Sequence, residues 1–183
     1  MLTGGYLTNR SKDCRKFVCL IMQIMKVSIE YETYEGLDQL TTTDRNLCIK
    51  SEEALKSSYS PYSGFKVGSA IRLKDGLVVL GSNQENVAYP SGLCAERVAL
   101  FTIGANHPGA EIESIAITAH SDQFEILKPV TSCGGCLQVM AEFELRQQKE
   151  ISVLFYCLNG QILKVHSVKS LLPFGFIEDR LTH

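Results

Sequence analysis

The chain has 183 residues, of which 45% are apolar and 21% are charged, and its formal net charge is −2. The isoelectric point near 6.1 gives no basic excess for nucleic acid, so a small-molecule substrate is favoured over a polymer. Seven cysteines, an odd number that includes a CxxC pair, argue against a secreted disulfide scaffold and indicate a reducing, cytoplasmic setting.

Residues 1–40 are predicted to form a leader, and residues 41–183 a single domain. In the leader, a basic stretch precedes the apolar run 17–22, an order that resembles a signal peptide. The run is interrupted at Gln23, has no small-residue cleavage site and is too short to cross a membrane. We therefore expect a disordered or loosely packed leader and no membrane association.

Beyond residue 40, apolar periodicity and turn signals predict alternating helices and strands. Helices are expected over residues 42–57, 94–105, 133–149 and 167–172. Strands are expected over residues 65–73, 77–80, 113–119, 151–157 and 161–165. Strand–helix–strand units favour a largely parallel centre, and a hairpin at each end makes the sheet mixed. The predicted fold class is α/β, a three-layer α/β/α sandwich with a central mixed five-stranded sheet.

The loop over residues 81–90 carries four consecutive amide or carboxylate side chains, at positions 83–86. One interpretation is a solvated loop with Asx-type turns. The other is a pocket wall that hydrogen-bonds a polyol such as ribose. The position of the loop directly before Cys94 favours the pocket wall.

Three cysteines and one glutamate form the chemical core of the sequence. Cys94 and Glu96 open one predicted helix, and Cys133 and Cys136 open the next, about forty residues later. Three thiolates suit a zinc ion and leave its fourth tetrahedral position open, as in catalytic sites. A structural zinc site is disfavoured because it would close the fourth position with another cysteine or histidine. A redox CxxC is disfavoured because its usual sequence setting is missing.

The helix starts provide a suitable electrostatic setting for such a site. The free N–H groups and positive dipole end there lower thiol pKa values. Arg97 can donate hydrogen bonds to a thiolate sulfur and so compensate negative charge; a surface ion pair is the alternative. Glu96 can take a proton from a zinc-activated water and pass it on, acting first as base and then as acid.

These residues carry a resemblance to a known family. From about residue 45 to 177, the chain resembles the small, homotetrameric, zinc-dependent cytidine deaminases. The matching segments are residues 59–68, 83–86, 89–90, 94–97, 133–138 and 171–173.

The resemblance implies hydrolytic deamination of cytidine and 2′-deoxycytidine to uridine and 2′-deoxyuridine plus ammonia, a step of pyrimidine salvage. Cys94, Cys133 and Cys136 would hold one Zn²⁺ per chain. Glu96 would protonate the ring nitrogen N3 while zinc-bound hydroxide attacks C4, and would then help ammonia leave. Deaminases of deoxycytidylate, guanine or tRNA adenosine usually carry histidine at the position of Cys94. With cysteine there, the sequence resembles the branch of the family that acts on nucleosides.

The resemblance also implies the substrate contacts. Asn83 and Glu85 would bind the ribose hydroxyls, and Phe65 would line the base pocket. Phe176 matches a C-terminal aromatic that reaches into a neighbouring subunit's active site in a homotetramer. An ordinary interface or core aromatic is the alternative for Phe176.

Two positions depart from the family pattern, and two other functions stay open. Ser132 and Leu137 stand where the family usually has proline and arginine around the CxxC. Without proline, the φ angle just before a zinc ligand is no longer fixed. Without arginine, one positive charge near the thiolates is missing, so Arg97 has to compensate more of their negative charge. The alternatives are a deaminase of blasticidin-type nucleoside antibiotics and a non-catalytic, zinc-containing nucleoside-binding protein. An RNA-editing enzyme is disfavoured by the acidic balance.

Overall fold

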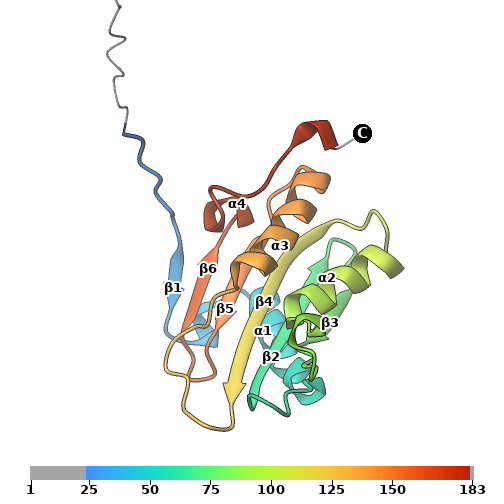
Figure 1. Ribbon diagram of the computed structural model, residues 1–183. Helices are drawn as coiled ribbons and strands as arrows, with labels where there is room; N and C mark the ends of the chain where they lie inside the picture. Colours follow the sequence, from blue (N-terminus) through green and yellow to red (C-terminus); the bar gives the residue numbers. More distant parts are fainter. Residues whose placement is uncertain (1–23, 182–183) are drawn as a thin grey trace, which may run out of the picture.

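The computed structural model describes residues 24–181 and contains a mixed sheet with helices on both faces (Figure 1). The strands are β1 (Glu32–Tyr34), β2 (Phe65–Leu73), β3 (Val78–Ser82), β4 (Ile112–Ser121), β5 (Ser152–Tyr156) and β6 (Ile162–Val165). The α-helices are α1 (Thr42–Ala54), α2 (Ala95–Asn106), α3 (Gly134–Gln147) and α4 (Val168–Leu171). Short 3₁₀ helices are η1 (Leu37–Gln39), η2 (Leu55–Ser57), η3 (Tyr89–Ser91) and η4 (Asp179–Leu181).

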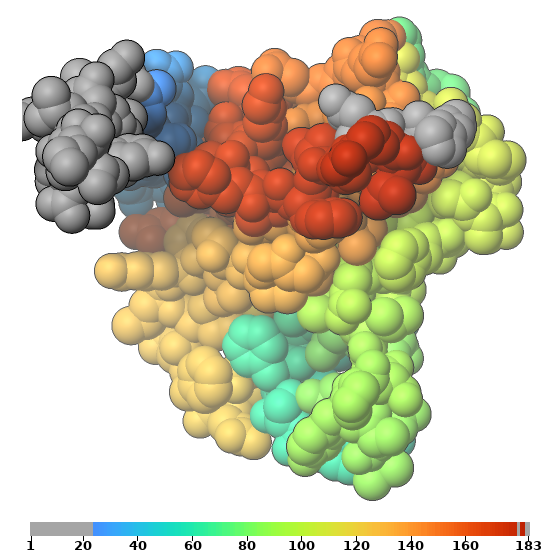
Figure 2. Space-filling view, turned by 45° about the horizontal axis from the view of Figure 1, so that its top comes forward, coloured from blue at the N-terminus to red at the C-terminus, as the bar shows by residue number. Residues whose placement is uncertain are grey.

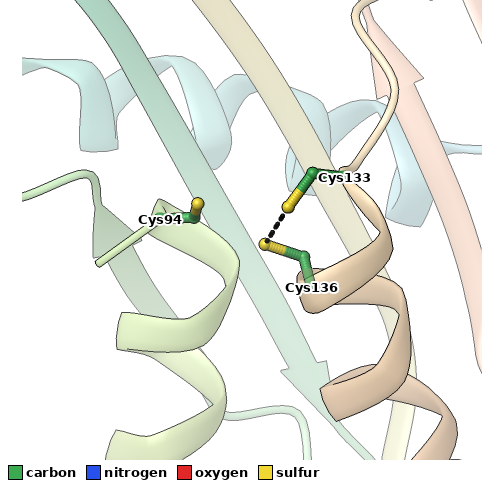
Figure 3. A group of neighbouring side chains, drawn as sticks. All are labelled: Cys94, Cys133 and Cys136. Carbon is green, nitrogen blue, oxygen red and sulfur yellow. Dashed lines mark hydrogen bonds between the residues drawn. The ribbon is translucent and has the colours of Figure 1, made fainter. Parts of the chain in front are cut away.

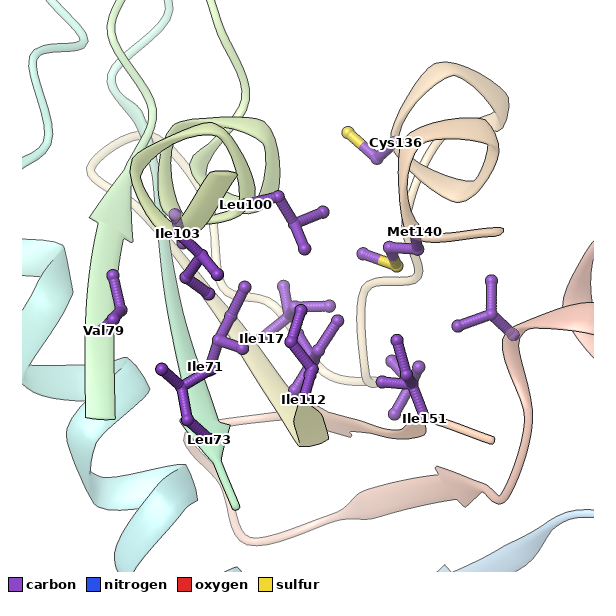
Figure 4. Close-up of a cluster of buried hydrophobic side chains, with 14 of the residues drawn as sticks. Ile71, Leu73, Val79, Leu100, Ile103, Ile112, Ile117, Cys136, Met140 and Ile151 are labelled. Carbon is purple, nitrogen blue, oxygen red and sulfur yellow. The ribbon is translucent and has the colours of Figure 1, made fainter. Parts of the chain in front are cut away.

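The helices divide between the two faces of the sheet, which confirms the predicted three layers. Alternation along β2 sends Ile71 into a core with α2 and α3, and Ala70 into a second core with α1. The larger core joins isoleucines of β2 and β4 to Leu100 of α2 and Met140 of α3 (Figure 4). Both helices that begin at candidate cysteines are therefore anchored on one face.

The prediction of a largely parallel centre was wrong. The strand order is β1-β6-β5-β4-β2-β3, and within residues 24–181 only β4 and β5 form a parallel pair. β2 lies between β3 and β4 and is antiparallel to both. The chain therefore passes through α2 from β3 to β4, two strands that run in the same direction but are separated by β2. The alternation of helices and strands in the sequence does not reveal this order.

The sheet has six strands rather than the predicted five, because residues 32–34 of the predicted leader form β1. This strand pairs antiparallel with β6, and Leu40 is buried in the core that includes α1. β1 is a three-residue edge strand whose sequence is Glu-Thr-Tyr, and a short polar edge strand gives little apolar signal. The signal-like run and the rest of residues 1–23 lie outside the described residues. No helix within residues 24–181 combines the length and apolar character that crossing a membrane requires.

Candidate functional site

The first turns of α2 and α3 bring three cysteine sulfurs together. Cys94 is the N-cap of α2 and Cys133 is the N-cap of α3, with Cys136 one turn further along α3. The three sulfur atoms lie within 4.8 Å of one another, and the Cys133 and Cys136 sulfurs are 3.6 Å apart (Figure 3). The cysteines are free thiols, so the predicted convergence of these three residues is confirmed.

This donor set fits zinc. With Zn–S bonds of about 2.3 Å, tetrahedral geometry places two sulfurs about 3.8 Å apart, which matches the Cys133–Cys136 separation. Cys136 is buried, Cys94 is half-buried and Cys133 is exposed, so the cluster lies between the core and solvent. A cluster of three soft ligands at that depth can hold one ion and leave a position open toward a pocket.

Arg97 supports a negative charge on this cluster. Its Nη2 atom lies 3.7 Å from the Cys94 sulfur, to which it donates a hydrogen bond. Hydrogen bonds from the Cys136 thiol and then from Arg97 lower the pKa of Cys94 to about 6. The same contact with Cys94, together with burial, raises the pKa of Cys136. Cys94 therefore loses its proton before Cys136 does.

Glu96 is a buried carboxylate beside this cluster. It lies in the first turn of α2 and is only 4% exposed. The hydroxyl of Ser132 donates a hydrogen bond to its Oε1 at 2.7 Å. No other hydrogen bond to the Glu96 side chain is found within the described part of the chain, so Oε2 is left for another partner.

A pocket of about 590 Å³ opens over the cysteines and Glu96, a size typical of small-molecule sites, which span roughly 300–1,000 Å³. Its wall includes Phe65 and Val67 of β2, the loop with Asn83 and Glu85, and Thr131 before α3. In Figure 2 the hollow lies between the green segment before α2 and the yellow-to-orange segment before α3. The pocket therefore gathers apolar and polar groups from distant parts of the chain around the thiols.

The two predicted ribose ligands line this pocket but also hold the loop in shape. The Asn83 side chain donates to the Phe65 carbonyl and accepts from Val67 N–H and from the Ser58 hydroxyl. The Glu85 carboxylate accepts from Tyr62 N–H and from the backbone N–H and hydroxyl of Ser63. The Ser63 hydroxyl and these N–H groups lower the pKa of Glu85. Both interpretations of the loop thus have support, since its side chains face a pocket and also stabilise turns.

The two predicted aromatic contacts lie in different surroundings. Phe65 lines the pocket and stacks on Phe124, with ring centroids 6.2 Å apart. Phe176 is 72% exposed and is absent from the pocket of its own chain. The Gln138 amide pairs with both the N–H and the carbonyl of Phe176, at 2.8 Å each. The Phe176 backbone is thus fixed on α3 while its ring stays available to another surface.

Sequence reasoning missed two of these contacts. The bond from Ser132 to Glu96 joins residues on different elements, and in the sequence position 132 stands out only for its missing proline. The bidentate contact of Gln138 with Phe176 likewise depends on how the C-terminal segment crosses α3. Neither contact has a local sequence signal.

Comparison with known proteins agrees with this geometry. Residues 41–151 match the family model described as the cytidine and deoxycytidylate deaminase zinc-binding region. A cytidine deaminase of Halalkalibacterium halodurans is 39% identical over 134 residues, which are 73% of this chain and 94% of that protein. A cytidine deaminase of Sporosarcina psychrophila is 34% identical over 75% of this chain and 93% of its own length.

Solved structures show the same likeness. The crystal structure of cytidine deaminase from Burkholderia pseudomallei superposes with a TM-score of 0.64 at 35% identity, covering 75% of this chain and all of that one. The residues that match the family model include the three converging cysteines and Glu96. The chain therefore belongs to the cytidine and deoxycytidylate deaminase zinc-binding family.

Proposed function

We propose that this chain is a zinc-dependent deaminase that converts cytidine and 2′-deoxycytidine to uridine and 2′-deoxyuridine plus ammonia. The observation that carries the proposal is the buried Glu96 carboxylate beside three converging thiols at the wall of a pocket. A closed structural zinc site has no need of such a carboxylate. We expect one catalytic domain, which includes β1 and begins before residue 41.

Cys94, Cys133 and Cys136 would hold the zinc ion. When bound, zinc supplies a Lewis acid that makes hydroxide available at neutral pH. Arg97 would offset part of the negative charge of three thiolates, because it donates a hydrogen bond to Cys94 and lies against the cluster. This role matters here because Leu137 supplies no second cation after the CxxC.

Glu96 would carry the protons of the reaction. Two glutamates line the pocket, but both carboxylate oxygens of Glu85 accept hydrogen bonds from the Tyr62–Ser63 turn. Glu96 has an oxygen without a hydrogen-bond partner among residues 24–181 and so is able to take a proton from water. It would deliver protons to N3 and to the departing amino group, while the C4–N bond breaks and a C4–O bond forms.

The remaining predicted residues would bind the substrate. Phe65 offers an apolar surface for the base, and Asn83 and Glu85 lie in the wall where ribose hydroxyls can be bound. Phe176, exposed but with a fixed backbone, would enter the site of a neighbouring subunit in a homotetramer. We place this enzyme in the cytoplasm, consistent with its free thiols.

The test measures conversion of cytidine to uridine by the wild-type chain and by Glu96→Gln, with ultraviolet absorbance as the readout. Glu142→Gln, on the exposed side of α3, is the matched control. We expect Glu96→Gln to keep its zinc and fold and to lose at least about 100-fold in kcat, since general acid–base catalysis contributes roughly 10²–10⁴-fold. Retained turnover in Glu96→Gln would refute its role. A wild-type chain that deaminates only nucleoside antibiotics, or that binds zinc without turnover, would support the two alternative functions.

A further inference from the structure

The hydroxyl of Ser132 is directly bonded to the carboxylate of Glu96. The Oγ–Oε1 distance is 2.7 Å, within the range of strong charge-assisted hydrogen bonds. Glu96 is almost completely buried and Ser132 is half-buried. The bond connects the segment before α3 to the first turn of α2, the two places that also supply the cysteines.

We propose that Ser132 is a positioning residue for Glu96, an inference that rests on the proposed function. The terminal torsion of a glutamate is broad and roughly two-fold, so an unrestrained carboxylate samples several orientations. The Ser132 hydroxyl occupies Oε1 and thereby selects one orientation, in which Oε2 is the oxygen that exchanges protons with the substrate. Proton transfer requires donor and acceptor in hydrogen-bond reach, so a fixed carboxylate raises the turnover rate.

The bond requires a side-chain donor at position 132. Proline, the residue that the family resemblance implies for this position, offers neither a hydroxyl nor an N–H. With proline at this position the glutamate would be held without this donor, so we expect the bond to raise the rate of the reaction without being essential for it. The expected effect of its loss is accordingly smaller than the effect of losing Glu96 itself.

The experiment compares Ser132→Ala, which removes the donor, with Ser132→Thr, which retains it. The matched control is Ser167→Ala, because Ser167 also donates its hydroxyl to a glutamate, Glu144 Oε1 at 2.9 Å, outside the pocket. For each variant we would measure kcat, KM, bound zinc and the thermal unfolding midpoint. We expect Ser132→Ala to lower kcat per bound zinc by about tenfold, the size of one hydrogen bond to a charged group.

A merely structural role for Ser132 gives a different pattern. If the bond only fastens the segment before α3, Ser132→Ala and Ser167→Ala would both lose stability and keep kcat per bound zinc. Positioning predicts instead that KM stays within about twofold, that Ser132→Thr recovers most of kcat, and that Ser167→Ala turns over like wild type. An unchanged kcat per bound zinc in Ser132→Ala, or a loss in Ser132→Thr as large as that in Ser132→Ala, would overturn the proposal.

A crystal structure of Ser132→Ala provides a readout that does not depend on activity. We expect the Glu96 carboxylate to occupy more than one orientation there, and a single wild-type orientation would contradict the positioning role. This readout separates the two proposals. Failure of the wild-type chain to convert cytidine would overturn the proposed function, while the orientation of Glu96 would still report on Ser132.

Discussion

Gly81 controls how closely strand β3 approaches the helix that carries Cys94 and Glu96. A Cβ atom added at Gly81 would lie 2.4 Å from the carbonyl oxygen of Ala95 and 2.6 Å from the nitrogen of Ala99. Both are backbone atoms of α2, which no side-chain rotation can move. Since ordinary contacts begin near 3.4 Å, Gly81→Ala must push the start of α2 away by about 1 Å.

That displacement falls on Ala95, which lies between the proposed zinc ligand Cys94 and the proposed proton carrier Glu96, and on Ala99 one turn further along α2. We expect Gly81→Ala to lower the free energy of unfolding by about 1–3 kcal/mol, as overpacked cores do. A shift of about 1 Å at a catalytic group can cost roughly 100-fold in rate, so kcat/KM for cytidine should fall by that order. Zinc should also bind more weakly, because Cys94 moves relative to the two cysteines of α3.

The assay combines urea unfolding, zinc titration and cytidine conversion, with Gly104→Ala as the control. Gly104 lies in the same helix α2, but a Cβ atom there would contact the ring of Phe143 at an ordinary 3.6 Å. Gly104→Ala should therefore raise stability by about 0.5–1 kcal/mol through helix propensity and leave turnover unchanged. Wild-type stability and kinetics in Gly81→Ala would refute the reasoning from close approach.

Three further perturbations test other parts of the structure. Glu144→Ala removes four hydrogen bonds, three of them from backbone N–H groups at the starts of α4 and β5. We therefore expect urea unfolding to show that the free energy of unfolding falls by about 3 kcal/mol. A decrease below about 1 kcal/mol would contradict this. Glu111 has its pKa lowered from 4.5 by Lys149 and then Lys74, so its contribution to stability is present above pH 4.5 and is lost as the pH falls through the lowered value. The difference in unfolding free energy between wild type and Glu111→Gln should therefore shrink in acid, and a constant difference would show that these ion pairs do not stabilise the fold. Phe176→Ala should raise KM for cytidine several-fold at unchanged zinc content, and an unchanged KM would show that the Phe176 ring does not contribute to substrate binding.

Sequence reasoning succeeded where the signal is local. Helix starts can be predicted from residue type and spacing, and a zinc site requires its thiols to converge. These two signals were enough to predict that Cys94, Cys133 and Cys136 lie together. The helices and main strands followed from periodicity for the same reason. Their bounds differ from the prediction by only a few residues.

The features that were missed depend on tertiary contacts. β1 is a strand only because β6 offers it an edge, and its three residues carry no pattern of their own. The place of β2 between β3 and β4 depends on packing across the whole sheet. Ser132 stands out in the sequence as a lost proline, whereas in the fold it is a donor to Glu96. The catalytic role of Glu96, the charge compensation by Arg97 and the binding roles of Phe65, Asn83, Glu85 and Phe176 stay predictions.

We propose that cytidine deamination by this chain depends on one zinc ion at the three cysteines, with Glu96 as the proton carrier. The most direct measurement titrates zinc into chelator-treated protein and follows conversion of cytidine to uridine in the same samples. We expect the rate to rise in proportion to bound zinc and to stop rising at one zinc per chain. Full conversion without zinc, or no conversion at one zinc per chain, would contradict it.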